Sequence, residues 1–193
     1  MSELFSIQLQ NRQQQGGDGV WLDLPTTTEQ VQAALRQIGI SSDNPQGLFI
    51  SGYFAEEEKR IAIPYNMVLA SNVDELNFLA ARLETLSAGE RAELNAALQA
   101  PQSELSSIGK ITDFPENVDY YVHLLDVRGP AQLGDYYLNR SGMVDMPEEW
   151  KGGIDTAQFG RYVAQQEQGV FTEYGYLVKS GDAWQKVHEG QPV

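Results

Sequence analysis

The sequence contains no cysteine and only two histidines, His123 and His188, among its 193 residues. A chain without cysteine forms no disulfide, thiolate nucleophile or zinc–thiolate site, and two imidazoles leave little for general acid–base chemistry. Positive charge is also scarce, because 13 Lys and Arg face 27 Asp and Glu, giving a formal net charge of −14 at pH 7. Direct binding to nucleic acid or to an anionic membrane is therefore disfavoured, and most enzyme classes would lack their usual side chains.

Long hydrophobic runs are missing too. The first residues, MSELFSIQLQ, contain neither the positive region nor the apolar stretch of a signal peptide, and no later run is long enough to span a membrane. We therefore expect a soluble, cytoplasmic protein. Apolar residues still make up 41% of the chain, enough to bury a core in one compact domain or a few small modules.

Segment 1–65 is predicted to be a small α+β module that opens with a β-hairpin. Phe5, Ile7 and Leu9 alternate with polar residues, as in a strand, and a glycine-rich turn precedes a returning strand at 20–22. The alternative for the Gln-rich run 8–15 is a disordered arm.

A helix and a buried strand complete this module. Either Thr26 with Glu29 or Thr27 with Gln30 fits a capping box, and Gly39 is placed to end the helix. The run 48–54 then indicates a buried strand.

Segment 66–112 is predicted to be helical. Ser71 or Asn72 can cap one helix, Ser87 with Glu90 forms another capping box, and a short third helix is predicted to start within 103–108.

Segment 113–193 is predicted to be a second α+β module with a variable tail from 179 onwards. Helices are expected at 130–139 and 155–166, and a single strand at 170–178. The predicted fold class is thus α+β, a chain of three small modules in the order α+β, helical, α+β.

The residues that could support catalysis or metal binding have simpler structural explanations. Glu148 and Glu149 diverge by about 100° on a helix, so we expect a solvated first turn rather than a catalytic pair. His123 lies among apolar and aromatic residues and is expected to be a hydrogen-bonded core histidine. The segment 41–47 supplies only one carboxylate, too few for a calcium site. We therefore expect no cofactor, no metal and no enzymatic activity.

One stretch of the chain is rich in carboxylates for its length. We take the residues that carry these carboxylates as the candidate partner-binding residues. They are Asp113, Glu116, Asp119, Asp126, Asp135, Asp145, Glu148 and Glu149. Proteins that hold duplex DNA line their grooves with Lys and Arg, so a surface of spaced carboxylates can occupy such a groove in place of phosphates. The simpler alternative is that the charge serves solubility alone.

Four sequence blocks, in order, resemble the ArdA antirestriction family. They are Trp21 to Pro25 with the helix and strand that follow, Asp74 to Ala80, Leu133 to Tyr137, and Ile154 through Phe159-Gly160-Arg161 to Tyr176. Together they cover most of residues 20–178. Three features depart from the family pattern, namely the Gln-rich segment before Trp21, the lack of acids flanking Tyr53, and the extension after 179.

The resemblance implies an elongated, non-enzymatic homodimer of three-domain subunits whose acids imitate the phosphates of bent DNA. On that basis the expected partner is a type I restriction–modification enzyme, bound at its methyltransferase and specificity subunits, and the protein would protect incoming mobile elements such as conjugative plasmids. Asp135 and Asp155 lie inside the resembling blocks and could instead be helix caps or folding residues. Two alternatives stay open, an acidic adaptor for another basic protein and, less favoured, a hydrolase with a carboxylate pair.

Overall fold

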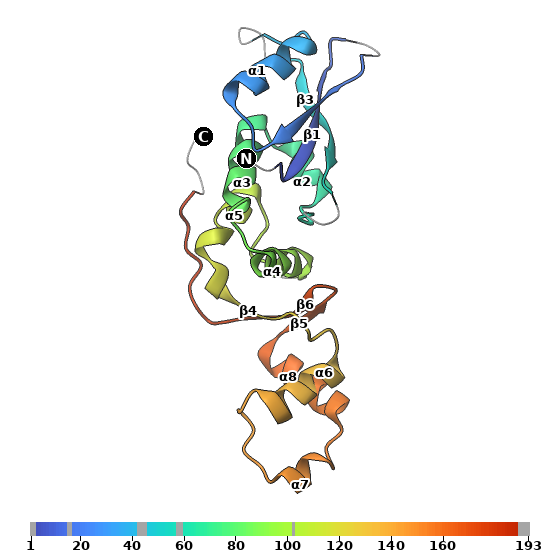
Figure 1. Ribbon diagram of the computed structural model, residues 1–193, viewed down its shortest axis with the longest axis vertical. Coiled ribbons are helices and arrows are strands. Elements are labelled where there is room, and N and C mark those ends of the chain that lie inside the picture. Colours follow the sequence, from blue (N-terminus) through green and yellow to red (C-terminus); the bar gives the residue numbers. More distant parts are fainter. Residues whose placement is uncertain (1–2, 15–16, 42–45, 57–59, 102, 189–193) are drawn as a thin grey trace. The chain divides into compact units, whose positions relative to one another are not determined.

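The computed structural model describes residues 3–14, 17–41, 46–56, 60–101 and 103–188 (Figure 1). Tertiary contacts group the chain into two compact units. Unit 1 comprises Met1–Leu86, Leu105–Glu116 and Lys186–Val193, and unit 2 comprises Ser87–Glu104 and Asn117–Gln185. The α+β class is confirmed, whereas the division into three modules stays a prediction.

Unit 1 contains a three-stranded antiparallel sheet in the order β2-β1-β3, built from β1 (Phe5–Asn11), β2 (Val20–Leu24) and β3 (Leu48–Phe54). The predicted hairpin and the predicted third strand are confirmed. The disordered-arm alternative is wrong for residues 8–14, which form β1 and the turn after it, while residue 15 lies outside the described residues.

The two faces of this sheet differ because side chains alternate along each strand. Phe5, Ile7 and Leu9 of β1 are almost fully buried and form the core with apolar residues of the helices. The other face holds the intervening polar residues of β1 and the side chains opposite them. Burial of one face fixes the register, since a shift by one residue would expose the core set.

Helix α1 (Thr28–Gln37) packs against β2 and begins at the predicted capping box of Thr27 and Gln30. The Gln30 amide donates to Thr27 Oγ1 at 3.4 Å, and the Thr27 amide donates to Gln30 Oε1 at 3.3 Å. This satisfies two backbone donors that a helix start otherwise leaves unpaired.

The remaining α-helices in the described part of unit 1 are α2 (Tyr65–Ala70), α3 (Val73–Leu83) and α5 (Ile108–Thr112), and a 3₁₀ helix follows α5 at Phe114–Glu116. Asn72 caps α3, so the second of the two predicted caps, Ser71 or Asn72, is the correct one. Helix α2 has no counterpart in the predictions from the sequence. The short helix predicted to start within 103–108 is confirmed by α5, which begins at Ile108 after Ser107, whose hydroxyl accepts from the Lys110 amide.

In unit 2, α4 (Ala88–Gln99) begins at the predicted Ser87–Glu90 capping box and packs against β6. The Glu90 carboxylate accepts from the Ser87 amide at 2.7 Å. The hydrogen bonds of Glu90 with Ser87 favour its charged form and hold the pKa of Glu90 below its ordinary value.

The sheet of unit 2 has the order β4-β6-β5 and consists of β4 (Tyr121–Leu124), β5 (Val170–Thr172) and β6 (Gly175–Lys179). The single strand expected at 170–178 is wrong, because the chain turns at residues 173–174 and β6 pairs back on β5. Thr172 Oγ1 closes this turn by accepting from the Tyr174 amide at 3.1 Å and donating to the Gly175 carbonyl at 2.8 Å.

A short 3₁₀ helix at Val118–Tyr120 precedes β4, and three further helices complete the described part of unit 2. They are α6 (Pro130–Asp135), which continues into a π-helical turn at Tyr136–Arg140, α7 (Glu148–Lys151) and α8 (Thr156–Glu167). The helices expected at 130–139 and 155–166 are thus confirmed within a residue or two. Asp155 caps α8, and its Oδ1 accepts from the amides of Ala157 at 2.9 Å and Gln158 at 3.0 Å.

Two glycines allow α6 and α8 to cross at close range. A Cβ on Gly134 would overlap the backbone carbonyl of Thr156, and a Cβ on Gly160 would overlap that of Pro130. Beside this crossing, Glu167 at the end of α8 accepts hydrogen bonds from the phenols of Tyr137 and Tyr176, the latter at 2.9 Å. The helix pair and the sheet are thereby joined around one core.

No helix in the described part of the chain is long and apolar enough to cross a membrane.

We predict that Gly160→Ala destabilises the protein by at least about 2 kcal/mol, because the new methyl group would force apart two backbones in a packed contact. Urea denaturation measures the effect. Gly152→Ala is the matched control, since Gly152 has ordinary helical φ and ψ and open space around its Cα. Its stability should stay within about 0.5 kcal/mol of the wild type. An equal effect of both substitutions would contradict the close helix crossing.

Candidate functional site

The excess negative charge of the chain is shared evenly between its two units. Unit 1 contains 14 Asp and Glu against 7 Lys and Arg, and unit 2 contains 13 against 6. What distinguishes individual carboxylates is therefore their environment, which separates the eight candidates into three groups.

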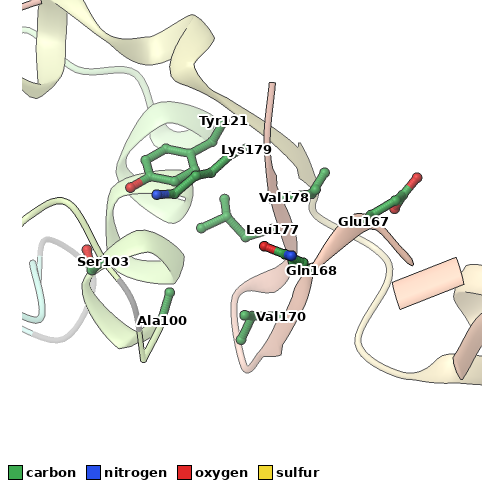
Figure 2. A pocket seen from close by; sticks show the side chains of 9 residues that line it. All are labelled: Ala100, Ser103, Tyr121, Glu167, Gln168, Val170, Leu177, Val178 and Lys179. Atoms are coloured by element: carbon green, nitrogen blue, oxygen red, sulfur yellow. The ribbon is translucent and has the colours of Figure 1, made fainter. Parts of the chain in front are cut away.

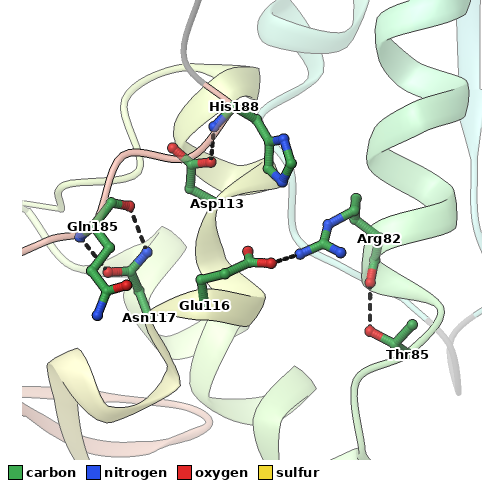
Figure 3. Close-up of polar contacts among 7 residues, drawn as sticks. All are labelled: Arg82, Thr85, Asp113, Glu116, Asn117, Gln185 and His188. Carbon is green, nitrogen blue, oxygen red and sulfur yellow. Dashed lines mark hydrogen bonds and ion pairs between the residues drawn. The ribbon is translucent and has the colours of Figure 1, made fainter. Parts of the chain in front are cut away.

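Asp113 does not belong to an exposed surface. Its side chain is 0% exposed, and its Oδ1 accepts a hydrogen bond from the His188 amide at 2.7 Å (Figure 3). A carboxylate buried in this way cannot meet a partner protein, so we exclude Asp113 from the candidate surface. It instead ties the C-terminal segment to the end of α5.

Glu116 is also committed within unit 1. Its carboxylate pairs with the guanidinium of Arg82 on α3, and both side chains are about 30% exposed (Figure 3). The Arg82 carbonyl in turn accepts from the Thr85 hydroxyl at 2.7 Å. Glu116 therefore fastens the end of the α5 segment to α3 and has limited freedom to pair elsewhere.

Part of the predicted variable tail is held in place in unit 2. Asn117 Nδ2 donates to the Gln185 carbonyl at 2.9 Å, and the Gln185 amide donates to Asn117 Oδ1 at 2.7 Å (Figure 3). The ring of Trp184 packs edge-on against Tyr120 with centroids 5.1 Å apart. These contacts order the segment up to residue 185.

Asp135 and Glu148 are exposed but already have a cation beside them. Asp135 Oδ2 lies 3.3 Å from an Arg140 guanidinium nitrogen, and Glu148 Oε1 lies 2.6 Å from Lys151 Nζ. Exposed ion pairs of this kind contribute only about 0–1 kcal/mol and exchange readily. Both carboxylates are thus available to a partner at the cost of an intramolecular pair.

Four candidates are exposed without such a neighbour in the described parts of the chain. They are Asp119, Asp126, Asp145 and Glu149. All four belong to unit 2. Asp119 lies in the short 3₁₀ helix Val118–Tyr120, Asp126 and Asp145 lie on connections, and Glu149 lies in the first turn of α7, where exposed glutamates were expected. We call these four residues the open carboxylates.

Two exposed acids outside the predicted stretch belong to unit 2 as well. Glu173 lies at the β5–β6 turn, where its carboxylate accepts from the Gln99 side chain, and Asp182 accepts from the Ser180 hydroxyl at 3.1 Å. Local charge density could not identify them, because each is isolated from other acids in sequence.

Glu93 differs from all these residues because it is poorly hydrated. Burial on α4, followed by the negative charges of Glu90 and Asp119, raises its pKa to about 7. Near neutral pH this side chain is therefore only partly ionised. The spacing of Glu90 and Glu93 by three residues places them on one helix face, a signal that the sequence does contain.

His123 is hydrogen-bonded, as its sequence context predicts, but it is half-buried rather than part of the core. Its Nε2 lies 2.9 Å from the Tyr174 carbonyl oxygen, and burial lowers its pKa. The ring connects β4 to the β5–β6 turn.

Two cavities of the described part of unit 2 each have a single carboxylate in their lining. One, of about 120 Å³, lies between the end of α4 and the sheet, and Glu167 is its one lining acid (Figure 2). This is smaller than most ligand sites, which enclose about 300–1,000 Å³. A larger hollow of about 340 Å³ contains Glu167 again as its one acid. Neither provides the two facing carboxylates that a glycosidase-type hydrolase requires.

Within the described residues, no three His, Asp or Glu side chains are grouped so that they could hold a metal ion.

The structure defines a small acidic α+β protein whose open carboxylates are exposed and line neither of the two cavities described above. The sequence profile of the antirestriction protein family ArdA matches residues 16–178. The chain therefore belongs to the ArdA antirestriction family, and the resemblance of its sequence blocks is confirmed. A search of curated proteins returned no match.

The raised pKa of Glu93 predicts a pH-dependent effect on stability. Its folded-state pKa of about 7 lies above the ordinary 4.5, so protonation favours folding, and this contribution is lost as pH rises through about 7. Glu93→Gln, which stays neutral, should match the wild type below the ordinary pKa of glutamate. In mildly alkaline buffer it should be more stable by about 1 kcal/mol, a value reduced for solvent screening.

Urea denaturation at both pH values measures this difference. Glu149→Gln makes the same chemical change at an exposed position and should alter stability little at either pH. A gain for Glu93→Gln that is equal at both pH values would contradict the raised pKa.

Proposed function

We propose that this protein is a DNA mimic that inhibits type I restriction–modification enzymes. It would occupy the DNA-binding groove formed by the methyltransferase and specificity subunits, without catalysing a reaction. The observation that supports this most strongly is the set of open carboxylates, which are exposed and have no cation beside them among the described residues, in a member of an antirestriction family.

The physical argument rests on the charge of the target. An enzyme that acts on duplex DNA must hold a polyanion, so its groove is lined with Lys and Arg and gains affinity from counterion release. An acidic protein can bind the same groove through charge-assisted hydrogen bonds from those cations to its carboxylates. Such an inhibitor acts where the enzyme meets incoming DNA, which places it in the cytoplasm and suits a mobile genetic element that enters by conjugation.

The alternative is an acidic adaptor that binds some other basic protein. Its binding would show the same salt dependence, but the adaptor would leave the restriction enzyme active. The third possibility, a carboxylate-pair hydrolase, has no supporting geometry in the described cavities.

We also propose a homodimer formed through unit 2. Val122 and Met143 are 46% and 75% exposed, and together with Tyr136 and Tyr137 they line the 340 Å³ hollow. Exposed apolar side chains that surround a hollow are typical of interaction surfaces. Sedimentation at micromolar concentration should give twice the 21.5 kDa of the chain, and Met143→Asp should shift it towards one chain. A wild type that sediments as a single chain would contradict the dimer.

DNA mimicry predicts that inhibition weakens step by step as the open carboxylates are neutralised. Each exposed ion pair contributes about 0.2–1 kcal/mol, so any one amide substitution should be tolerated. Replacing Asp119, Asp126, Asp145 and Glu149 together should weaken inhibition of DNA cleavage by a purified type I enzyme by roughly tenfold or more, and should reduce its salt dependence.

The matched control is the pair Asp135→Asn and Glu148→Gln. These carboxylates already have intramolecular cations, so their neutralisation should weaken inhibition less per charge removed. If one open-carboxylate substitution alone abolished inhibition in a folded protein, a localised site would replace the distributed surface.

A further inference from the structure

The sheet face of unit 1 that is turned away from the core has two large exposed aromatic side chains. The strand register places Trp21 and Gly52 on either side of Gln8, and the next row places Asp23 and Phe54 on either side of Ser6. Trp21 is 50% exposed and Phe54 is 58% exposed. We call Trp21, Asp23 and Gly52, with the surface between them, the indole platform.

The indole of Trp21 lies across the sheet. It starts on β2, yet a Cβ added to Gly52 on β3 would be only 3.0 Å from the Cη2 atom of Trp21 and 3.1 Å from the Cβ of Gln8. β2 and β3 are separated by β1, a span of about 10 Å for two inter-strand spacings. A ring that reaches this far has its long axis nearly parallel to the sheet and extends across β1 towards the buried Gly52. Half of the Trp21 surface stays exposed to solvent, which leaves the ring accessible to a partner.

A carboxylate is held beside this ring. Asp23 is two residues after Trp21 on β2, so it projects from the same face, and its Oδ1 accepts a hydrogen bond from the Ser6 hydroxyl at 2.7 Å. The carboxylate stays exposed to solvent. A flat indole with an adjacent oriented carboxylate matches the guanidinium of arginine, which stacks on aromatic faces while donating to a carboxylate.

The same sheet face already holds one guanidinium on an aromatic ring. Arg12 Cζ lies 5.2 Å from the ring centroid of Phe49, and the register places Phe49 opposite Gln10, in line with Gln8 and Ser6. Unit 1 also has twice as many acids as cations, which favours the approach of a basic group.

We propose that the indole platform binds an arginine side chain of a basic partner protein. The identity of that partner as a restriction enzyme rests on the proposed function, but the chemistry of the site does not. Carboxylates attract the partner over long range, whereas the platform adds a short-range contact that distinguishes arginine from lysine. Arginine therefore binds here with the guanidinium stacked on Trp21 and paired with Asp23.

The test uses NMR spectra of the full-length protein during titration with hexa-arginine, followed through the indole N–H signals. Substitution of each tryptophan by phenylalanine assigns these signals. Trp150 is a control inside the same chain, because it is 66% exposed and follows two exposed glutamates but is not part of the platform. The Trp21 indole and the Gly52 amide should shift at peptide concentrations about threefold lower than Trp150, and hexa-lysine should act more weakly than hexa-arginine.

Two variants test the geometry. Asp23→Asn removes the carboxylate, and Gly52→Ala places a methyl group against the ring and tilts it away. Both should weaken the Trp21 response to hexa-arginine by about threefold and leave that of Trp150 unchanged. Thermal unfolding confirms that each variant is folded. Trp21→Phe keeps a smaller aromatic face and serves as a third variant, followed through the Gly52 amide, which should still respond but more weakly.

Equal responses of Trp21 and Trp150, or equal responses to hexa-arginine and hexa-lysine, would overturn the proposal in favour of unspecific charge attraction. A Trp21 signal that changes with protein concentration alone would show that a second copy of the chain covers the platform, and would overturn it too. The titration contains no restriction enzyme, so its outcome is separate from any failure of the wild type to inhibit cleavage.

Discussion

The structure depends on how the fold accommodates repulsion among its carboxylates, because the chain has 27 carboxylates and only 13 cations. Some carboxylates are used inside the fold. Glu90 and Asp155 begin helices, Glu116 pairs with Arg82, and Glu167 joins two tyrosines. Each of these has donors that compensate for its charge. The open carboxylates have none among the described residues, and exposed like charges lower the stability of the free protein unless a partner supplies cations. The same feature that makes the surface unfavourable for folding makes it favourable for binding a basic groove.

The blocks that resemble the family coincide with positions where packing allows few alternatives. Gly134 and Gly160 permit the crossing of α6 and α8, Asp155 caps α8, and Gly175 has a φ of +132° at the start of β6. A side chain at either crossing glycine would collide with backbone. These blocks therefore define much of the scaffold of unit 2, whereas the open carboxylates lie outside the blocks, on short helices and on connections. The resembling blocks therefore point to residues that pack the scaffold more directly than to residues that bind a partner.

Local signals predicted much of the fold. Both capping boxes, the first hairpin and helices α3, α4 and α8 follow from short-range patterns of polar and apolar residues. The errors occurred where a distant contact decides the structure. The run 170–178 has the composition of one strand, but Thr172 and Gly175 close a turn within it. In the sequence, Asp113 belongs to an acidic stretch, yet its side chain is buried and accepts a hydrogen bond from the amide of a residue 75 positions away. The orientation of the Trp21 indole similarly requires Gly52, two strands away, which no local pattern indicates.

The most direct test of the account is whether the protein and duplex DNA exclude each other from the same groove. A labelled duplex is bound to the methyltransferase and specificity core of a type I enzyme without motor subunits, and the inhibitor is added at a low and a high salt concentration. The account predicts full displacement of the duplex at low salt and a steep loss of inhibitor binding at high salt. A stable ternary complex of core, duplex and inhibitor would contradict DNA mimicry and favour an acidic adaptor.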